Sequence, residues 1–297
     1  NFHMTAVAIR CAGRVNGVSR KHGQVSRSLW KDMWPGRPAE TVPIGHVTNG
    51  VHLATWMAGS IQNLLAAHLG ADWQRRFDED PSAWDQVLSL DHQRLWIAHR
   101  RLKQVLTNHV REDARHRFAG QLKEAAAVVG AGTLLDPEVL TIGFARRFAT
   151  YKRASLLFSE LDRLRRLCTN AHRPLQIIFA GKAHPEDKPG KEVLQEVYRY
   201  TRDPRFEGRI AFLEDYDMHL AHLLVQGVDL WMNLPRVPHE ASGTSGMKAA
   251  LNGVPSRSVL DGWWIEGHVE GVTGWSIGDA SGTENDSSAE ATSLYDK

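Results

Sequence analysis

The sequence has few cysteines, no long apolar run and no excess of charge of either sign. Its 297 residues include only Cys11 and Cys168, which predicts neither a disulfide framework nor a zinc site and favours a reducing compartment. No apolar stretch is long enough to cross a bilayer, and a formal net charge of +2 argues against a nucleic-acid surface. We therefore expect a cytoplasmic globular protein with no nucleic-acid or membrane partner.

The two ends of the sequence lack an initiator Met, a secretory signal and, at the C-terminal end, apolar residues to bury. The first residue is Asn1, not Met, and residues 2–10 look helical, with no basic and apolar segments of a secretory signal. The last stretch, from about residue 279 to residue 297, is polar and rich in Ser, Glu and Asp, with little to bury. We expect a piece of a longer protein.

From about residue 137 onward, short apolar runs alternate with helical patterns. The predicted strands cover residues 139–144, 175–180, 209–213, 228–232 and 258–260. The predicted helices between them cover residues 151–167, 191–202 and 218–226. Strands separated by helices of this length predict an α/β fold with a doubly wound parallel sheet, whose two covered faces explain the continuous apolar runs. A helical stretch over 57–131 precedes them, after a turn and a domain crossover near 50–56.

The densest chemical signal is the segment from Glu240 to Gly253, in which small residues lead into an apolar helical turn. Gly243 and Gly246 let the backbone approach a ligand, and free N–H groups at the helix start can meet an anion. We expect Lys248 in the first turn, where the macrodipole disfavours a cation unless an anion is bound. A lysine with a lowered pKa is also what imine formation requires. The alternative is a plain loop with a lysine that packs its stem on apolar surface.

A second signal is a group of four cations in eight residues: Arg146, Arg147, Lys152 and Arg153. The group follows the first predicted strand, so it belongs at the carboxyl end of a parallel sheet, where such sheets bind ligands. A phosphate clamp is one interpretation. A solvated helix face is the other, and charge alone favours it.

Two weaker patterns predict no site. His219 and His222 could bind a metal, but no carboxylate or third histidine is evidently placed beside them, so we expect no metal. Trp263, Trp264 and Trp275 could stack on sugar rings, but large aromatic residues more often fill cores.

Taken together, these segments resemble the α-glucan (glycogen, starch and maltodextrin) phosphorylases, in order from residue 1 to about Gly267. The segments that show the resemblance are residues 14–19, 48–51, 147 with 151–153, 180–183, 212–216, 240–248, and 251–253 with 261–262. The run Glu-Ala-Ser-Gly-Thr…Met-Lys at 240–248 is highly specific. Residues 46–52 and 262–264 look more like the shorter bacterial branch. The resemblance is to the C-terminal half of such an enzyme.

The resemblance implies a GT-B-type architecture, in which two Rossmann-like domains face a deep cleft. Residues 1–55 look like the trailing segment of the N-terminal domain with the crossover. Residues 56–297 resemble the C-terminal domain that carries pyridoxal 5′-phosphate, with a polar tail from about residue 279. Lys248 matches the lysine that binds this cofactor as an imine. The positions around the cofactor are Trp56, Arg146, Tyr216, Thr244 and Ser245. Arg147 and Lys152, with Lys248, match catalytic positions, and Glu240, Ser242 and Gly243 match the glucose-binding ones.

Two positions depart from the family pattern. Arg146 stands where many members have Lys, and Asp217 stands where mammalian-type members have Arg. The change at Asp217 removes one possible aid to binding the cofactor phosphate.

The activity that the resemblance implies is phosphorolysis of α-1,4-glucans, with transfer of a terminal glucosyl unit to inorganic phosphate to give glucose 1-phosphate. We expect the isolated chain to be inactive, and the whole enzyme could be a homo-oligomer. Glu240 should face sugar hydroxyls, because beside the phosphates it would add repulsion. Two rival interpretations are a nucleotide-sugar glycosyltransferase of the same architecture and a non-catalytic glucan-binding fragment.

Overall fold

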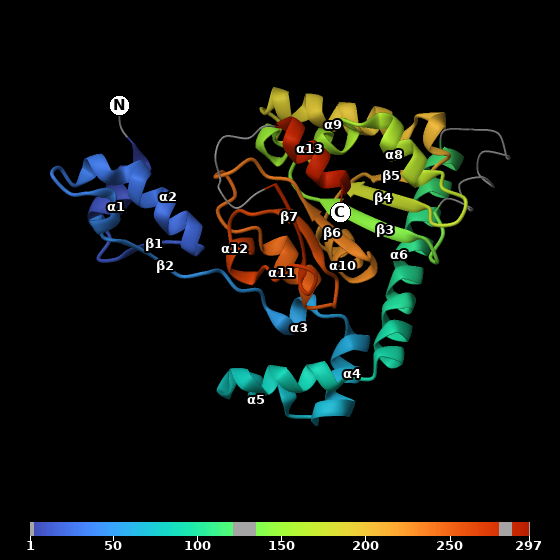
Figure 1. Ribbon diagram of the computed structural model, residues 1–297, viewed down its shortest axis with the longest axis horizontal. Coiled ribbons are helices and arrows are strands. Elements are labelled where there is room, and N and C mark those ends of the chain that lie inside the picture. The colour runs from blue at the N-terminus through green and yellow to red at the C-terminus, as the bar shows by residue number, and fades with distance from the viewer. Residues whose placement is uncertain (1–2, 121–134, 279–286, 297) are drawn as a thin grey trace.

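A six-stranded parallel sheet forms the centre of the computed structural model, which describes residues 3–120, 135–278 and 287–296 (Figure 1). The strands are β3 (Leu140–Ala145), β4 (Leu175–Ala180), β5 (Ile210–Leu213), β6 (Leu230–Asn233), β7 (Ser256–Val259) and β8 (Gly274–Ile277). Their order in the sheet is β5-β4-β3-β6-β7-β8, and every pair is parallel. The predicted doubly wound sheet is confirmed, and β8 is a strand that the sequence analysis did not predict. The order reverses between β3 and β6, which is where such sheets bind ligands.

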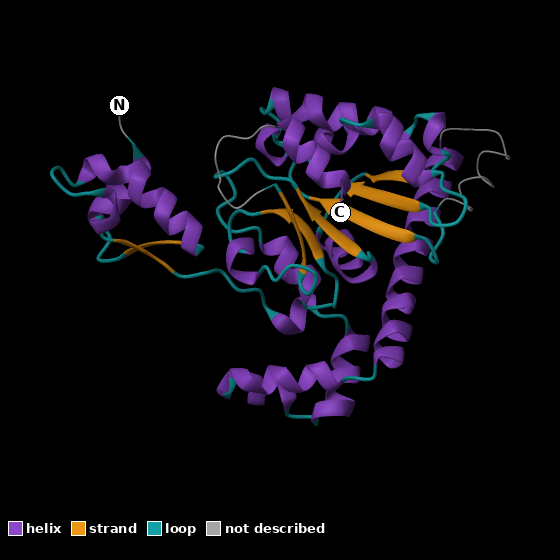
Figure 2. Cartoon of the chain, viewed as in Figure 1, coloured by secondary structure: helices purple, strands orange, loops and turns teal. Residues whose placement is uncertain are grey.

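Helices cover both faces of the sheet, so the strands are buried on both sides (Figure 2). Alternate strand residues such as Phe144 and Phe179 pack in one core cluster with side chains of α8, α9 and α13. Their neighbours Ala145 and Ile178 pack in the other with side chains of α6, α10 and α11. These helices are α6 (His92–Gly120), α8 (Leu161–Cys168), α9 (Lys188–Thr201), α10 (Met218–Gly227), α11 (Thr244–Ala250) and α13 (Ser287–Asp296).

The helical stretch before the sheet forms an arm below it (Figure 1). It contains α3 (Leu53–Trp56), α4 (Gly59–Leu69), α5 (Trp73–Glu79) and the 3-10 segment η3 (Pro81–Ser89), and it continues into α6. Ile61, Leu65, Trp73 and Phe77 are the centre of a separate small core. The predicted helix content is confirmed up to residue 120, and residues 121–131 lie outside the described residues.

The N-terminal segment forms a small lobe beside the main body (Figure 1). Here α1 (Met4–Cys11), α2 (Arg20–Trp30) and two short 3-10 turns pack around a two-stranded parallel sheet of β1 (Val15–Gly17) and β2 (Ile44–His46). The segment between the two helices is thus a short strand. Gly17 is required there, because a Cβ would lie 2.5 Å from the backbone nitrogen of Gly23.

The segment predicted as a helix over 151–167 is different in the structure. It forms the 3-10 turns η4 (Thr150–Lys152) and η5 (Ala154–Phe158), followed by α8. Between the two turns Arg153 adopts a left-handed backbone with φ of 47°, which ends a helix. The Arg153 guanidinium donates to the carbonyl oxygens of Leu234 and Pro235, so distant groups stabilise this conformation.

The chain after residue 286 also differs from expectation. Residues 287–296 form α13, whose Ala291 and Leu294 are buried against the sheet-covering helices. The expectation that this segment has little to bury is wrong for these residues. Glu290, on the same helix, forms a buried ion pair with Arg153.

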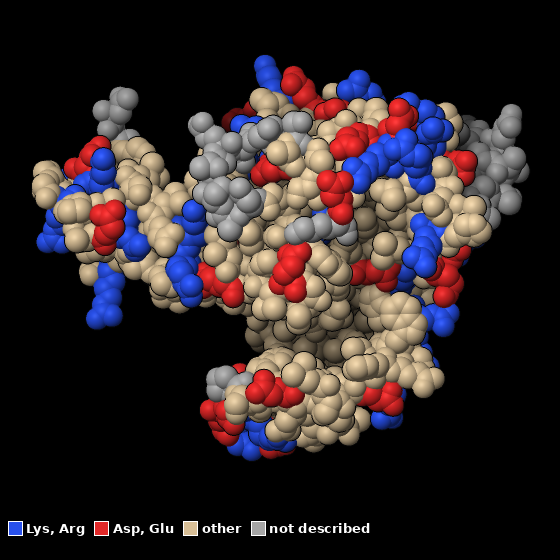
Figure 3. Space-filling model, viewed as in Figure 1, with Lys and Arg blue, Asp and Glu red and all other residues tan. Residues whose placement is uncertain are grey.

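No helix in the described part of the chain is long and apolar enough to span a membrane. Acidic and basic side chains are interspersed on the face of the molecule shown in Figure 3.

If α13 is part of the core, Leu294→Ala should lower the free energy of unfolding by about 2–5 kcal/mol, as expected for removing a buried leucine side chain. Thr292→Ala changes an exposed position on the same helix and is the matched control. Urea unfolding followed by circular dichroism measures both. Equal stabilities of the two variants would contradict the packing of α13 against the core.

Candidate active site

The residues predicted to form a site gather at one edge of the sheet. Arg146 follows β3, Tyr216 follows β5, and Glu240 follows β6. Parallel strands end at the same edge, so segments that are far apart in the sequence meet there. The helix α11, which carries Lys248, begins in the loop after β6.

A buried cluster of two cations and one carboxylate lies at this edge. Arg146 donates from Nη2 to Glu240 Oε2 over 2.9 Å, and Lys152 donates from Nζ to the same oxygen. The three side chains are only 8–12% exposed. Burial lowers the pKa of Arg146, and the Glu240 carboxylate opposes this shift. Within the described residues, Nε and Nη1 of Arg146 are buried and have no hydrogen-bond partner, so they could bind an anion.

Glu240 is the counter-charge of the predicted phosphate-binding cations, and its contact with sugar hydroxyls stays a prediction. Both cations are buried, and a buried cation is stable only beside a counter-charge. Glu240 supplies that charge through Oε2, while Oε1 makes no hydrogen bond to the described residues. Asp261 holds the position of Glu240, because Asp261 Oδ2 accepts from the Glu240 backbone N–H over 2.8 Å. Burial raises the pKa of the Asp261 carboxyl.

The short loop after Glu240 is held by a tryptophan that the sequence analysis assigned to the core. Trp263 donates from its backbone N–H to the Ser242 carbonyl and from Nε1 to the Gly243 carbonyl, each over 2.9 Å. Gly243 has a φ of 85°, which favours glycine. Ser242 is buried, and its Oγ has no hydrogen-bond partner among the described residues. This hydroxyl is therefore available to a ligand.

Lys248 lies in the last turn of α11, not in the first turn as expected. Its Nζ is 3.6 Å from the ring centroid of Trp56, in cation–π geometry. Burial lowers the pKa of the Lys248 ammonium. The cause is therefore burial and not the positive end of the helix macrodipole. A lowered pKa raises the fraction of neutral amine, which is the form that attacks a carbonyl group.

The remaining predicted site residues make different contacts around the cluster of Arg146, Lys152 and Glu240. Tyr216 and Trp56 both pack against the same core cluster, and burial raises the pKa of Tyr216 while Arg146 opposes the shift. Ser245 Oγ accepts from Trp231 Nε1 over 3.2 Å, so its hydroxyl faces the sheet. Thr244 begins α11. Arg147 is exposed, and no hydrogen bond or ion pair to it is found within the described residues, so the structure does not join it to the buried cluster.

Asn252 also supports the site, and the sequence analysis gave it no role. Its Nδ2 donates to the carbonyl oxygens of Trp56 and Lys248, each over 2.9 Å, and its Oδ1 accepts from the backbone N–H of Ala58 over 2.8 Å. The only signal in the sequence is its place in the Leu-Asn-Gly run directly after the helix.

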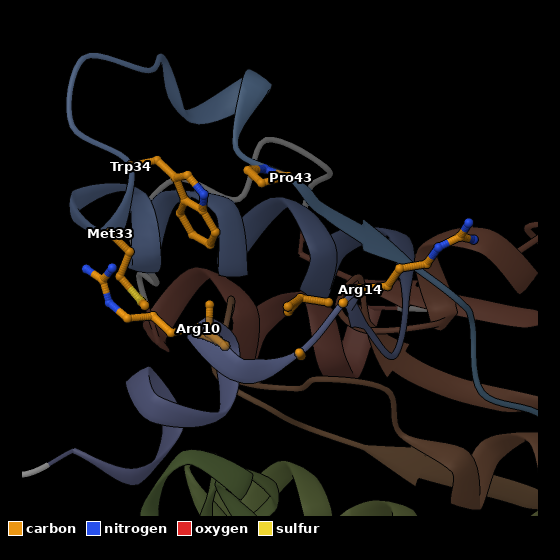
Figure 4. A pocket seen from close by; sticks show the side chains of 9 residues that line it. Arg10, Arg14, Met33, Trp34 and Pro43 are labelled. Atoms are coloured by element: carbon orange, nitrogen blue, oxygen red, sulfur yellow. The ribbon is translucent and has the colours of Figure 1, made fainter.

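The part of the chain that the structure describes contains no group of three or more His, Cys, Asp or Glu side chains that could hold a metal. A separate cavity of about 320 Å³ lies in the N-terminal lobe, and its labelled lining residues are Arg10, Arg14, Met33, Trp34 and Pro43 (Figure 4). Arg14 points away from the other labelled side chains, and none of the predicted site residues lines this cavity.

Comparisons with known proteins agree on one family. A family model described as carbohydrate phosphorylase matches residues 1–273. A glycogen phosphorylase of Aquifex aeolicus is 42% identical over 99% of this chain and 42% of its own length. A maltodextrin phosphorylase of Thermococcus litoralis is 43% identical over 99% of this chain and 35% of its own length. A glycogen phosphorylase of Mycobacterium tuberculosis is 42% identical over 99% of this chain and 34% of its own length. The chain thus spans 34–42% of the length of these curated relatives.

Because Glu240 neutralises two buried cations, Glu240→Gln should lower the free energy of unfolding by about 3–5 kcal/mol. Chemical denaturation of both proteins at neutral pH measures the difference. Glu192→Gln removes the same charge from an exposed position on α9 and should change stability little. A Glu240→Gln protein as stable as the Glu192→Gln protein would show that the cluster does not need this carboxylate.

Proposed function

The chain belongs to the carbohydrate phosphorylase family, and we propose that it is part of an enzyme that phosphorolyses α-1,4-glucans. In this reaction a terminal glucosyl unit moves to inorganic phosphate and gives glucose 1-phosphate. One observation carries the proposal beyond the family assignment. Arg146 is buried, and its Nε and Nη1 have no hydrogen-bond partner among the described residues, so it suits an anion. At the same sheet edge lies α11, whose half-buried Lys248 has a lowered pKa and suits a carbonyl group.

We propose pyridoxal 5′-phosphate as the cofactor, attached to Lys248. The residues present fit it, because the Lys248 amine lies beside the Trp56 ring, and Trp56 and Tyr216 both pack against the core cluster on this side of the sheet. Arg146 offers Nε and Nη1 to the phosphate group. When bound, pyridoxal phosphate supplies a phosphate group that can exchange a proton with the substrate phosphate. Thr244 and Ser245 are the remaining proposed cofactor-binding residues, and the Ser245 hydroxyl would have to leave Trp231 to take part.

The charges at the site explain why several cations are needed. Two phosphates of about −1.5 to −2 each, held ~5 Å apart at an effective dielectric constant of about 20, repel by on the order of 10 kcal/mol. Arg146 and Lys152 both donate to Glu240 Oε2, and we propose that they are the fixed part of the phosphate clamp. Arg147 follows Arg146 directly and is exposed, so its guanidinium is free to bind the incoming phosphate as a planar fork.

The proposed glucose-binding residues lie next to this clamp. Ser242 offers a buried hydroxyl, and Gly243, whose positive φ favours glycine, has no side chain to cover the backbone. Glu240 can serve both parts of the site, since Oε2 takes the two cations and Oε1 is left for sugar hydroxyls. A carboxylate near the reacting sugar also favours the positive charge that develops in an oxocarbenium-like transition state.

The remaining proposals concern the whole protein. We propose that residues 1–55 are the trailing segment of a preceding domain, which with the domain of residues 56–297 encloses a cleft of the GT-B type. The 297-residue chain by itself should then release no glucose 1-phosphate from maltodextrin. A cytoplasmic location and assembly into a homo-oligomer are also proposed.

In the whole protein, Lys248→Ala should abolish the absorbance band of the bound cofactor and leave pyridoxal phosphate removable by dialysis. The physical reason is the loss of the only amine proposed to hold it. Borohydride reduction followed by peptide mapping identifies the labelled lysine, and Lys182→Ala, at an exposed position, is the control. Labelling of a lysine other than Lys248 would refute the assignment. Absence of any band in the unaltered protein would favour a nucleotide-sugar glycosyltransferase or a glucan-binding fragment.

Arg147→Ala in the whole protein should raise the apparent constant for phosphate by about 30-fold or more, because a charge-assisted pair to the bound anion is lost. Cofactor content should stay near normal. Arg147→Lys keeps the positive charge but loses the planar guanidinium, so its apparent constant for phosphate should lie between those of the unaltered protein and Arg147→Ala. Arg199→Ala, on the exposed face of α9, is the control. Phosphate and maltodextrin are varied independently. A change confined to the maltodextrin constant would place Arg147 at the glucan and not at the phosphate.

A further inference from the structure

Both ring nitrogens of His222 lie within hydrogen-bond distance of backbone carbonyl oxygens. Its Nδ1 lies 2.8 Å from the carbonyl oxygen of Met218, and its Nε2 lies 2.9 Å from the carbonyl oxygen of Thr55. The His222 ring therefore lies between its own helix α10 and α3, with one nitrogen facing a carbonyl oxygen of each.

The same ring contacts the tryptophan beside the proposed cofactor lysine. The His222 and Trp56 rings are stacked, with centroids 4.4 Å apart and an interplanar angle of 24°. Trp56 also lies 3.6 Å from Lys248 Nζ. A change at His222 therefore reaches Lys248 through one side chain.

The helix that carries Trp56 depends on side chains from elsewhere. With four residues, α3 is too short to be stable by itself. The carbonyl oxygens at its end are bound by side chains of other elements, since His222 binds that of Thr55 while Asn252 and Gln226 bind that of Trp56. Of these three side chains only His222 can carry a charge, and only His222 also stacks on the Trp56 ring.

We propose that His222 is a positioning residue whose ring fixes α3, so that Trp56 stays against Lys248. The functional consequence rests on the proposed attachment of pyridoxal phosphate to Lys248. His219, one turn earlier on α10, does not share this role, since its ring packs edge-on to His109 of α6. The two histidines that looked like a metal pair in the sequence thus face different elements.

The charged and titratable groups around His222 come from several elements. Lys248 of α11 lies across Trp56, and His52 shares a hydrogen bond of 2.7 Å with the Thr55 hydroxyl. On α10 itself, His219 is one turn away and Asp217 caps the helix by accepting from the Leu220 N–H. Removing the His222 ring removes its contact with the Thr55 carbonyl oxygen, so α3 loosens.

The test is hydrogen exchange at the backbone amides of Trp56 and Met57, which donate to the carbonyl oxygens of His52 and Leu53. It uses the whole protein without cofactor. His222→Leu should speed this exchange by roughly tenfold, the effect of losing about one hydrogen bond of support. His222→Gln keeps one side-chain donor and should retain part of the protection.

His219→Leu is the matched control, because it makes the same change on the same helix without touching α3. With pyridoxal phosphate added, His222→Leu should also weaken cofactor binding by roughly tenfold, measured by absorbance, while attachment stays at Lys248. Unchanged exchange at Trp56 and Met57 in His222→Leu overturns the proposal, and so does an equal effect of His219→Leu. If the unaltered protein does not attach the cofactor at Lys248, the proposed function fails, while the exchange result still decides the role of His222 in holding α3.

Discussion

The site depends on one carboxylate oxygen that two buried cations share. Taking Arg146, Lys152 and Glu240 out of water is costly, and their attraction offsets that cost only when the geometry is held. The surrounding loop supplies this geometry. Asp261 binds the backbone of Glu240, and Trp263 binds the two residues that follow Ala241. The cluster therefore requires β3, β6 and the loop after β7 to be in place at the same time.

Several segments that are distant in the sequence converge on the same loop. Ser19, which begins the second helix of the N-terminal lobe, donates to the Ala241 carbonyl over 2.7 Å. Glu266 accepts from the backbone N–H of Arg20 and from the Thr48 hydroxyl, over 2.8 Å and 2.7 Å. The lobe and the segment that leads to α3 thus contact the main domain beside the proposed glucose-binding residues.

The end of the described chain is linked to the cation cluster through Arg153. This side chain is buried next to Lys152 in the sequence and pairs with Glu290 of α13. The family match ends at residue 273, before this helix. The left-handed backbone at Arg153 directs Lys152 to Glu240 on one side and the guanidinium to α13 on the other. Residues beyond the matched region therefore support the proposed phosphate clamp.

The sequence by itself determined the parallel sheet and the edge at which the site lies. Continuous apolar runs and helical periods are local patterns, and parallel strands place the segments after them at a common edge. It also singled out Arg146, Lys152, Glu240 and Lys248 by their motifs.

Only the tertiary structure decided how these side chains meet. Glu240 binds Arg146 and Lys152, which are about ninety residues away in the sequence. Lys248 lies in the last turn of its helix. The left-handed backbone at Arg153 interrupts the segment that was predicted as one continuous helix. Residues 287–296 of the polar segment form a packed helix. Each of these outcomes depends on partners that are distant in the sequence, and local residue patterns carry no information about which buried charge pairs with which.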